Sequence, residues 1–132
     1  MISPDDHDLL LIHHEAFGLW IQPGGHLDPA DTSLRNAALR ELSEETAMTA
    51  ISSPEWAPGI LDLDIHRVPA DIKGQPAHLH FDIRFAFRAH SRSVQAGSDA
   101  RDVGWFPLDS LDTPTTDASV RRAIRRILTL RS

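Results

Sequence analysis

The chain has 132 residues, which is enough for one ordinary hydrophobic core and too few for two, so we expect a single domain over residues 1–132. Apolar residues make up 41% of the sequence and charged residues 24%, the balance of a soluble globular domain. The net charge of −6 argues against binding to a nucleic-acid polymer, which requires a basic face. It does not exclude a single nucleotide, because metal ions can supply the missing positive charge. The absence of cysteine excludes disulfides, thiolate metal sites and cysteine nucleophiles.

Nothing in the sequence indicates a membrane protein. No apolar run approaches the roughly 18 residues that a membrane span needs. The first six residues are polar and acidic, unlike a signal peptide. We therefore expect a cytoplasmic protein without a membrane partner.

The first half of the chain predicts two strands and a helix. Leu9 to Ile12 reads as a buried strand, and Leu19 to Gln22 as a short strand that Pro23-Gly24-Gly25 ends. From Leu34 to about Thr46 nothing breaks a helix. Asp31, Thr32 and Ser33 are all candidates for its N-cap.

The second half begins with a loop rich in serine and proline and continues with two alternating runs. Residues 61–66 and 78–87 each alternate apolar with polar side chains, which predicts strands with one apolar and one polar face. The connection through Gly74 and Pro76 suggests an antiparallel pair. Val103 to Phe106 predicts a further short strand.

A terminal helix is expected after Thr116 or Asp117, with a row of apolar residues on one face. It carries several arginines, which could form an anion site. A solvated helix face is the interpretation we favour, because charge runs usually have that role. These arginines are Arg121, Arg122, Arg125, Arg126 and Arg131.

Three carboxylates gather near the end of the first helix. At about 100° per residue, Glu41, Glu44 and Glu45 fall within an arc of roughly 100° on one helix face. Arg40 is a single cation beside three anions, so a divalent ion is the better counter-charge. Hard oxygen ligands favour Mg²⁺, Ca²⁺ or Mn²⁺. The competing interpretation is a plain surface helix with a glutamate-rich end, and Gly24-Gly25, which allows close backbone approach to a ligand, favours the metal.

This segment resembles the Nudix box, whose pattern is Gly, five residues, Glu, seven residues, then Arg-Glu-aliphatic-x-Glu-Glu-x-Gly-aliphatic. The residues that match are Gly25, Arg40, Glu41, Leu42, Glu44 and Glu45. Two departures stand out. Eight residues separate Asp31 from Arg40, so either Asp31 replaces the first glutamate or Thr32 takes that register and the glutamate is absent. The late glycine is Ala47, which puts the left-handed turn after the helix in question.

The resemblance implies an α/β Nudix fold, with a mixed, curved β-sheet sandwiched between helices (α/β/α). It also implies a metal-dependent pyrophosphohydrolase that cleaves the phosphoanhydride bond of a nucleoside diphosphate linked to another group, using one or more Mg²⁺ or Mn²⁺ ions. Its partner would be a small nucleotide-type substrate, and a homodimer is left open. The implied metal ligands are Glu41, Glu44, Glu45 and the carbonyl of Gly25, and the implied catalytic residues are Glu44, Glu41 and Arg40, with the general base unassigned between glutamates.

Histidine is the unusual feature of the sequence. His78, His80, Asp82 and Arg84 share one strand face, and Asp62, Asp64 and His66 share a face of the other strand. Three interpretations remain open: a half-exposed polar sheet face, a substrate-binding wall, and a second metal site that imidazole would bias toward Zn²⁺. The candidate substrate-binding residues are His26, His78, His80, Asp82, Arg84, Asp99 and Asp102.

Other functions on the same fold are weighed against hydrolysis. A catalytically weak nucleotide-binding module is the main alternative, since fold alone does not decide function. The intact set of Glu41, Glu44 and Glu45 favours turnover. Isoprenoid isomerisation is disfavoured because that chemistry in the relatives uses a cysteine, and a histidine-based metal carrier would bind Zn²⁺ even after Glu44→Gln.

Overall fold

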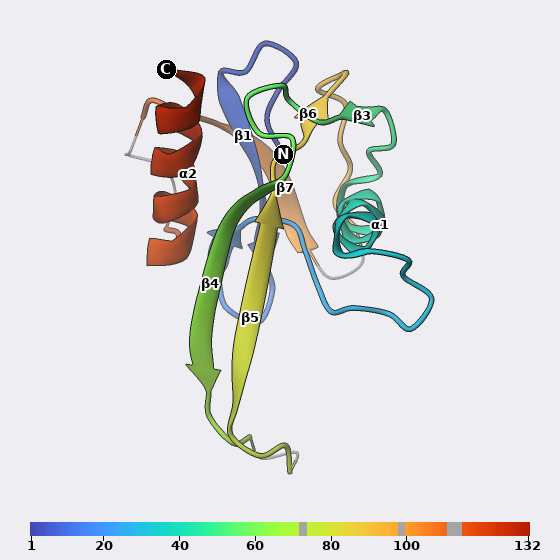
Figure 1. The fold of residues 1–132 in the computed structure, drawn as a ribbon, viewed down its shortest axis with the longest axis vertical. Coiled ribbons are helices and arrows are strands. Elements are labelled where there is room, and N and C mark those ends of the chain that lie inside the picture. Colours follow the sequence, from blue (N-terminus) through green and yellow to red (C-terminus); the bar gives the residue numbers. More distant parts are fainter. Residues whose placement is uncertain (72–73, 98–99, 111–114) are drawn as a thin grey trace.

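The computed structural model describes residues 1–71, 74–97, 100–110 and 115–132 (Figure 1). Within these residues no helix is long and apolar enough to cross a membrane. In chain order the elements are β1 (Asp8–His14), β2 (Leu19–Ile21), α1 (Leu34–Thr46), β3 (Ile51–Ser52), β4 (Ile60–Val68), β5 (His78–Phe85), β6 (Arg88–Ala89), β7 (Ala100–Pro107) and α2 (Ala118–Arg131).

The central strand β1 carries the core on both of its faces. It lies between β2 and β7 and pairs antiparallel with each. Leu9 and Leu11 pack in one cluster with residues of α2, and Leu10 packs in a second cluster with Leu42 of α1. Because both faces are covered, this strand is an uninterrupted apolar run. Figure 1 shows the two helices on opposite sides of the strands, which confirms the expected α/β/α layers.

Helix α1 has the bounds that the sequence predicts. Its N-cap is Ser33, whose hydroxyl accepts a hydrogen bond from the Asn36 N–H (3.0 Å). It ends at Ala47, which adopts the left-handed conformation (φ 57°) and donates its N–H to the Ser43 carbonyl (2.9 Å). The turn that glycine favours therefore forms on an alanine, at a steric cost.

Two short strands escape prediction and one predicted strand ends early. β3 and β6 pair antiparallel through Ile51↔Ala89, but two residues are too few for a pattern. The alternating run was expected to continue to Phe87, whereas β5 ends at Phe85 and Phe87 is buried beyond it. Ile2 forms an antiparallel bridge to Leu9 and a parallel one to Arg88, which makes the pairing mixed.

Strands β4 and β5 form an antiparallel ribbon that extends away from the rest of the molecule (Figure 1). Their register places Asp64 opposite Asp82 and His66 opposite His80, so the two polar faces coincide. The apolar side chains of the opposite face are the more exposed ones, notably Ile65 and Phe81. The ribbon thus turns its polar face toward the body and its apolar face outward.

Candidate active site

Arg40 is the centre of the carboxylate cluster on α1. Its Nη1 donates to Glu41 Oε1 (3.0 Å) and, one turn along, to Glu44 Oε2 (3.1 Å). Its Nη2 also donates to the His26 carbonyl (3.1 Å). One guanidinium therefore joins two of the three glutamates to the loop that precedes the helix.

The first acidic position of the box is filled by Asp31. Arg40 Nε and Nη2 donate to the two carboxylate oxygens of Asp31 at 3.0 and 2.9 Å, a bidentate pair. These hydrogen bonds from Arg40 lower the pKa of Asp31. Thr32 instead accepts a hydrogen bond from Asn36 Nδ2. Of the two registers that the sequence leaves open, the structure adopts the one in which the shorter aspartate meets Arg40.

The glycine pair lies directly against the glutamates. The Gly24 N–H donates to Glu45 Oε2 (2.8 Å). A Cβ added to Gly25 would lie 2.5 Å from Glu41 Oε1, which no side chain tolerates without displacing that carboxylate. The glycine loop therefore lies against the carboxylates, whose oxygens are the donor type that Mg²⁺ and Mn²⁺ prefer. The residues present fit a hard divalent ion.

The three glutamate side chains point to different partners in this structure. Glu41 and Glu44 share Arg40, whereas Glu45 accepts from Gly24. Among the described residues, the group with three His or carboxylate donor atoms within 4.8 Å of one another is Asp64, His66 and Asp82 on the ribbon. Binding of an ion by the glutamates thus requires rotation of their side chains, which the exposure of Glu44 allows.

A second glycine, which no sequence pattern revealed, supports the end of α1. A Cβ on Gly97 would lie 2.4 Å from the Glu44 carbonyl oxygen and 2.8 Å from the Glu45 Cα. The Gly97 N–H donates to the Glu45 carbonyl (2.9 Å). Here the crowding is with backbone, so only glycine fits. A lone glycine after Gln95-Ala96 carried no motif that could have revealed this contact.

A row of imidazoles connects this cluster to the ribbon. The His26 ring lies 5.7 Å from that of His80, and the His80 ring lies 5.4 Å from His66 and 4.9 Å from His78. Since the His26 carbonyl binds Arg40, the polar face of the ribbon is continuous with the glutamate cluster. The structure brings His78, His80 and Asp82 together on one face of the ribbon, as the sequence suggested, and adds His26 to them through its contact with His80.

Arg84 has a different environment, at the junction of the ribbon with α2. Its buried side chain donates to Asp62 Oδ2 (2.9 Å) and to Ser119 (2.8 Å). Arg122 of α2 donates to the same aspartate at 2.7 Å and lies 3.0 Å from Asp64. Hydrogen bonds from Arg122 and Arg84 lower the pKa of Asp62. Arg122 is thus an exception to the predicted solvated face, whereas Arg121, Arg125 and Arg126 are exposed.

The remaining candidates lie away from these contacts or outside the described residues. Asp102 is an exposed residue of β7 whose carboxylate accepts from the Val103 N–H (2.8 Å). Asp99 lies outside the described residues. Trp20 and Trp105 are partly buried against the two core clusters, as expected for aromatics beside strands.

Comparison with known proteins gives a family and a fold. The family model of the NUDIX domain matches residues 1–127. No curated protein matches the sequence.

Three solved structures illustrate the likeness of fold. An Ap4A hydrolase from C. elegans, solved as a binary complex, is 19% identical over 92% of this chain and 84% of its own, with a TM-score of 0.69. The NUDIX domain of Shewanella oneidensis NrtR, complexed with ADP ribose, is 24% identical over 98% of this chain and 82% of its own, with a TM-score of 0.61. A MutT NUDIX hydrolase from Burkholderia pseudomallei is 25% identical over 92% and 88%, with a TM-score of 0.59.

Proposed function

The chain belongs to the Nudix hydrolase family of pyrophosphohydrolases, and from this premise we propose that it cleaves a phosphoanhydride bond in a nucleoside diphosphate linked to another group. The observation that carries the proposal is Arg40, which ties Glu41 and Glu44 to Asp31 and the glycine loop. The nucleotides named for the similar structures, Ap4A and ADP ribose, support a substrate of this class.

The cofactor we propose is Mg²⁺ or Mn²⁺, held by Glu41, Glu44, Glu45 and the carbonyl of Gly25. Such an ion would supply positive charge for the phosphate oxygens and would lower the pKa of water at the site. Glu44 or Glu41 would then accept the proton of the attacking water. Arg40 orients both carboxylates through Nη1, and Asp31 fixes Arg40 from the opposite side.

The substrate-binding wall in this proposal is the polar face of the ribbon together with the glycine loop. His26, His78, His80 and Asp82 provide hydrogen-bonding groups for a base, a ribose or a phosphate. Their continuity with Arg40 through the His26 carbonyl supports this role. Arg84, on the same face of β5, anchors the wall to α2 through its contacts with Asp62 and Ser119.

The test is a panel of nucleotide derivatives incubated with Mg²⁺ or Mn²⁺ and scored for phosphate-containing products. We expect metal-dependent cleavage of at least one compound between two phosphates. The alternative, a nucleotide-binding module with weak catalysis, predicts compounds that bind, as measured by calorimetry, without product above the metal-only control.

A second ion is proposed at Asp64, His66 and Asp82. His66 Nδ1 lies 3.5 Å from Asp64 Oδ2 and 3.6 Å from Asp82 Oδ2. Good hydrogen bonds are shorter, up to about 3.2 Å. Two ligands of a tetrahedral zinc ion stand about 3.4 Å apart, given bonds of about 2.1 Å. The two aspartates are also directly opposite on paired strands, where like charges destabilise a sheet. Arg122, 3.0 Å from Asp64, and Arg84, 3.9 Å from Asp82, offset part of this repulsion, and an ion between the two carboxylates would offset more of it.

Calorimetric titration with Zn²⁺ in the Glu44→Gln background isolates this second site. Binding is expected to persist in Glu44→Gln and to be lost when His66→Gln is added. His90→Gln in the same background is the control, because His90 contacts Ser52 rather than the aspartates. Equal Zn²⁺ binding in the His66 and His90 variants would contradict the second site.

A further inference from the structure

The outward face of the β4–β5 ribbon is an apolar surface that the described residues leave largely uncovered. Four cross-strand pairs follow this face in register: Ile60↔Phe85, Leu63↔Ile83, Ile65↔Phe81 and Arg67↔Leu79. Phe85, at the end nearest the body, packs against the core cluster that contains Leu42, so the uncovered part of the face begins beyond it. Ile60 joins this face because the register shifts between Ile60 and Asp62. Five of the apolar side chains are between 52% and 61% exposed: Ile60, Leu63, Ile65, Leu79 and Phe81.

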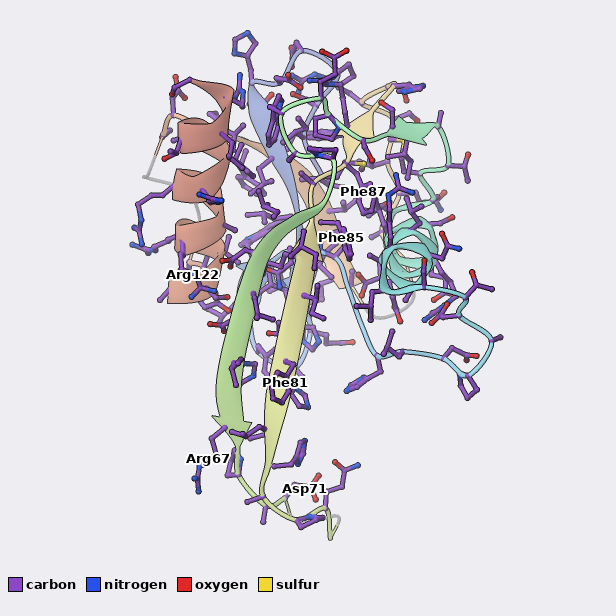
Figure 2. The ribbon with its side chains drawn as sticks, in the orientation of Figure 1. Arg67, Asp71, Phe81, Phe85, Phe87 and Arg122 are labelled. Atoms are coloured by element: carbon purple, nitrogen blue, oxygen red, sulfur yellow. The ribbon has the colours of Figure 1, made fainter. Side chains whose placement is uncertain are left out.

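This orientation is the reverse of the usual one for a half-covered antiparallel sheet, in which the apolar face packs on the core. Here the polar face is held inward by the pairing of Asp62 with Arg84 and Arg122. In Figure 2 the labelled Phe81 lies on the ribbon lower in the view than either helix, below the level of Arg122. No described helix therefore covers these side chains, and exposed patches of this kind typically mark interaction sites.

The size and composition of the face fit an interface between two copies of the chain. The exposed parts of the five side chains amount to about 500 Å², given roughly 200 Å² for a large aromatic side chain and somewhat less for Leu or Ile. A standard interface buries about 800 Å² per partner, and about 65% of a homodimer interface is apolar. Those proportions require about 500 Å² of apolar surface on each side.

The charge distribution also favours a second copy of the chain over a membrane surface as the partner of this face. In the four pairs of this face the charged residue is Arg67, at the far end of the ribbon. A membrane surface would instead need several cations around the patch, and the chain carries a net charge of −6. A second copy offers an equally apolar face, on which Arg67 again lies at the far end of the ribbon.

We propose that two copies of the chain associate through the outward faces of their β4–β5 ribbons, packed face to face about a two-fold axis. Leu63, Ile65 and Phe81 form the centre of the interface. The polar faces then point away from the axis, so both glutamate clusters stay open to solvent. This association does not depend on the proposed catalytic activity.

Sedimentation of the full chain tests the interface. We expect a dimer at micromolar concentration, and Phe81→Glu should raise the dissociation constant more than about 100-fold, since each interface gains two buried, unpaired carboxylates. Phe17→Glu is the matched control, because Phe17 is 68% exposed in the turn between β1 and β2. It should leave the dissociation constant unchanged.

A cross-linking experiment covers the event that Phe81→Glu fails to fold. Because the chain has no cysteine, Leu63→Cys introduces a single thiol near the proposed axis, and Phe17→Cys one away from it. Mild oxidation should link Leu63→Cys into a covalent dimer faster than Phe17→Cys. A monomeric wild-type chain at 100 micromolar concentration or above, a Phe81→Glu chain that remains dimeric, or equal cross-linking of the two cysteine variants would each overturn the proposal.

Discussion

The close contacts of Gly25 predict that a substitution at this residue affects the proposed catalysis more than it affects folding. The atoms that a Cβ would meet belong to the carboxylate of Glu41, at the end of a flexible side chain. The Glu41 side chain can move aside, but it then loses the hydrogen bond from Arg40 that orients its carboxylate. The expected damage is therefore to the geometry of the glutamate cluster.

Gly25→Ala should lower turnover at least about tenfold, because small displacements of a catalytic group carry large rate penalties. The free energy of unfolding should change by less than about 1 kcal/mol. Steady-state kinetics and urea denaturation measure the two effects. Gly59→Ala serves as the control, since a Cβ there meets no atom within 4 Å. Equal turnover in the two variants would show that Gly25 does not contribute to the site.

Ala47 is a second residue with a testable local effect, because its backbone adopts the left-handed conformation that its side chain disfavours. Its φ of 57° costs an alanine roughly 1 kcal/mol more than a glycine. Ala47→Gly should therefore raise the free energy of unfolding by about 0.5–1 kcal/mol, measured by urea denaturation. Ala38→Gly, in the interior of α1, should lower it by about 1 kcal/mol. A loss of stability in Ala47→Gly would contradict the left-handed turn.

At the scale of elements, the ribbon depends on its ion-paired junction with α2. Asp62 accepts hydrogen bonds from both Arg84 and Arg122, and Arg84 is buried. Removing the carboxylate leaves that cation with the more distant Asp82, 3.9 Å away, and breaking a buried pair in this way costs about 3 kcal/mol. This junction also fixes which face of the ribbon points inward.

The pH dependence of Asp62→Asn follows from the lowered pKa of Asp62. The carboxyl is a stronger acid in the folded chain than in the unfolded chain, where its pKa is about 3.9. Its stabilising contribution is therefore present above about pH 4 and is lost as pH falls further. Asp62→Asn should lower the free energy of unfolding by about 3 kcal/mol at pH 7. The difference from the wild type should shrink below about pH 4, as followed by denaturation across pH. A constant difference would show that Asp62 acts through packing alone.

Patterns in the sequence predict elements well where local chemistry decides them. The caps and spacing of α1 and the alternation of β4 and β5 were sufficient for those elements. The alternation of apolar and polar residues predicts two faces of the ribbon but not which face points inward. That orientation depends on the contacts of Arg84 and Arg122 with Asp62, which lies 22 and 60 residues away from them in the sequence. The strands β3 and β6 were missed because two residues carry no period.

At the scale of the whole molecule, the sequence predicted only those contacts of the site that lie within one helix. Arg40 and the three glutamates lie within one helix, so their proximity follows from its geometry. The choice of Asp31 over Thr32 required the path of the loop, and the contact of Gly97 with α1 required a segment more than fifty residues away. The proximity of His26 to His80 likewise follows from packing of the loop against the ribbon.

The central claim is that the glutamates of α1 hold the ion used in hydrolysis. Its most direct test is metal-dependent turnover of Glu44→Gln, on the best substrate of the panel, with Glu55→Gln as the control on an exposed loop. We predict that Glu44→Gln loses turnover by about 100-fold or more, with an unchanged circular dichroism spectrum, while Glu55→Gln matches the wild type. Wild-type turnover in Glu44→Gln would contradict the account.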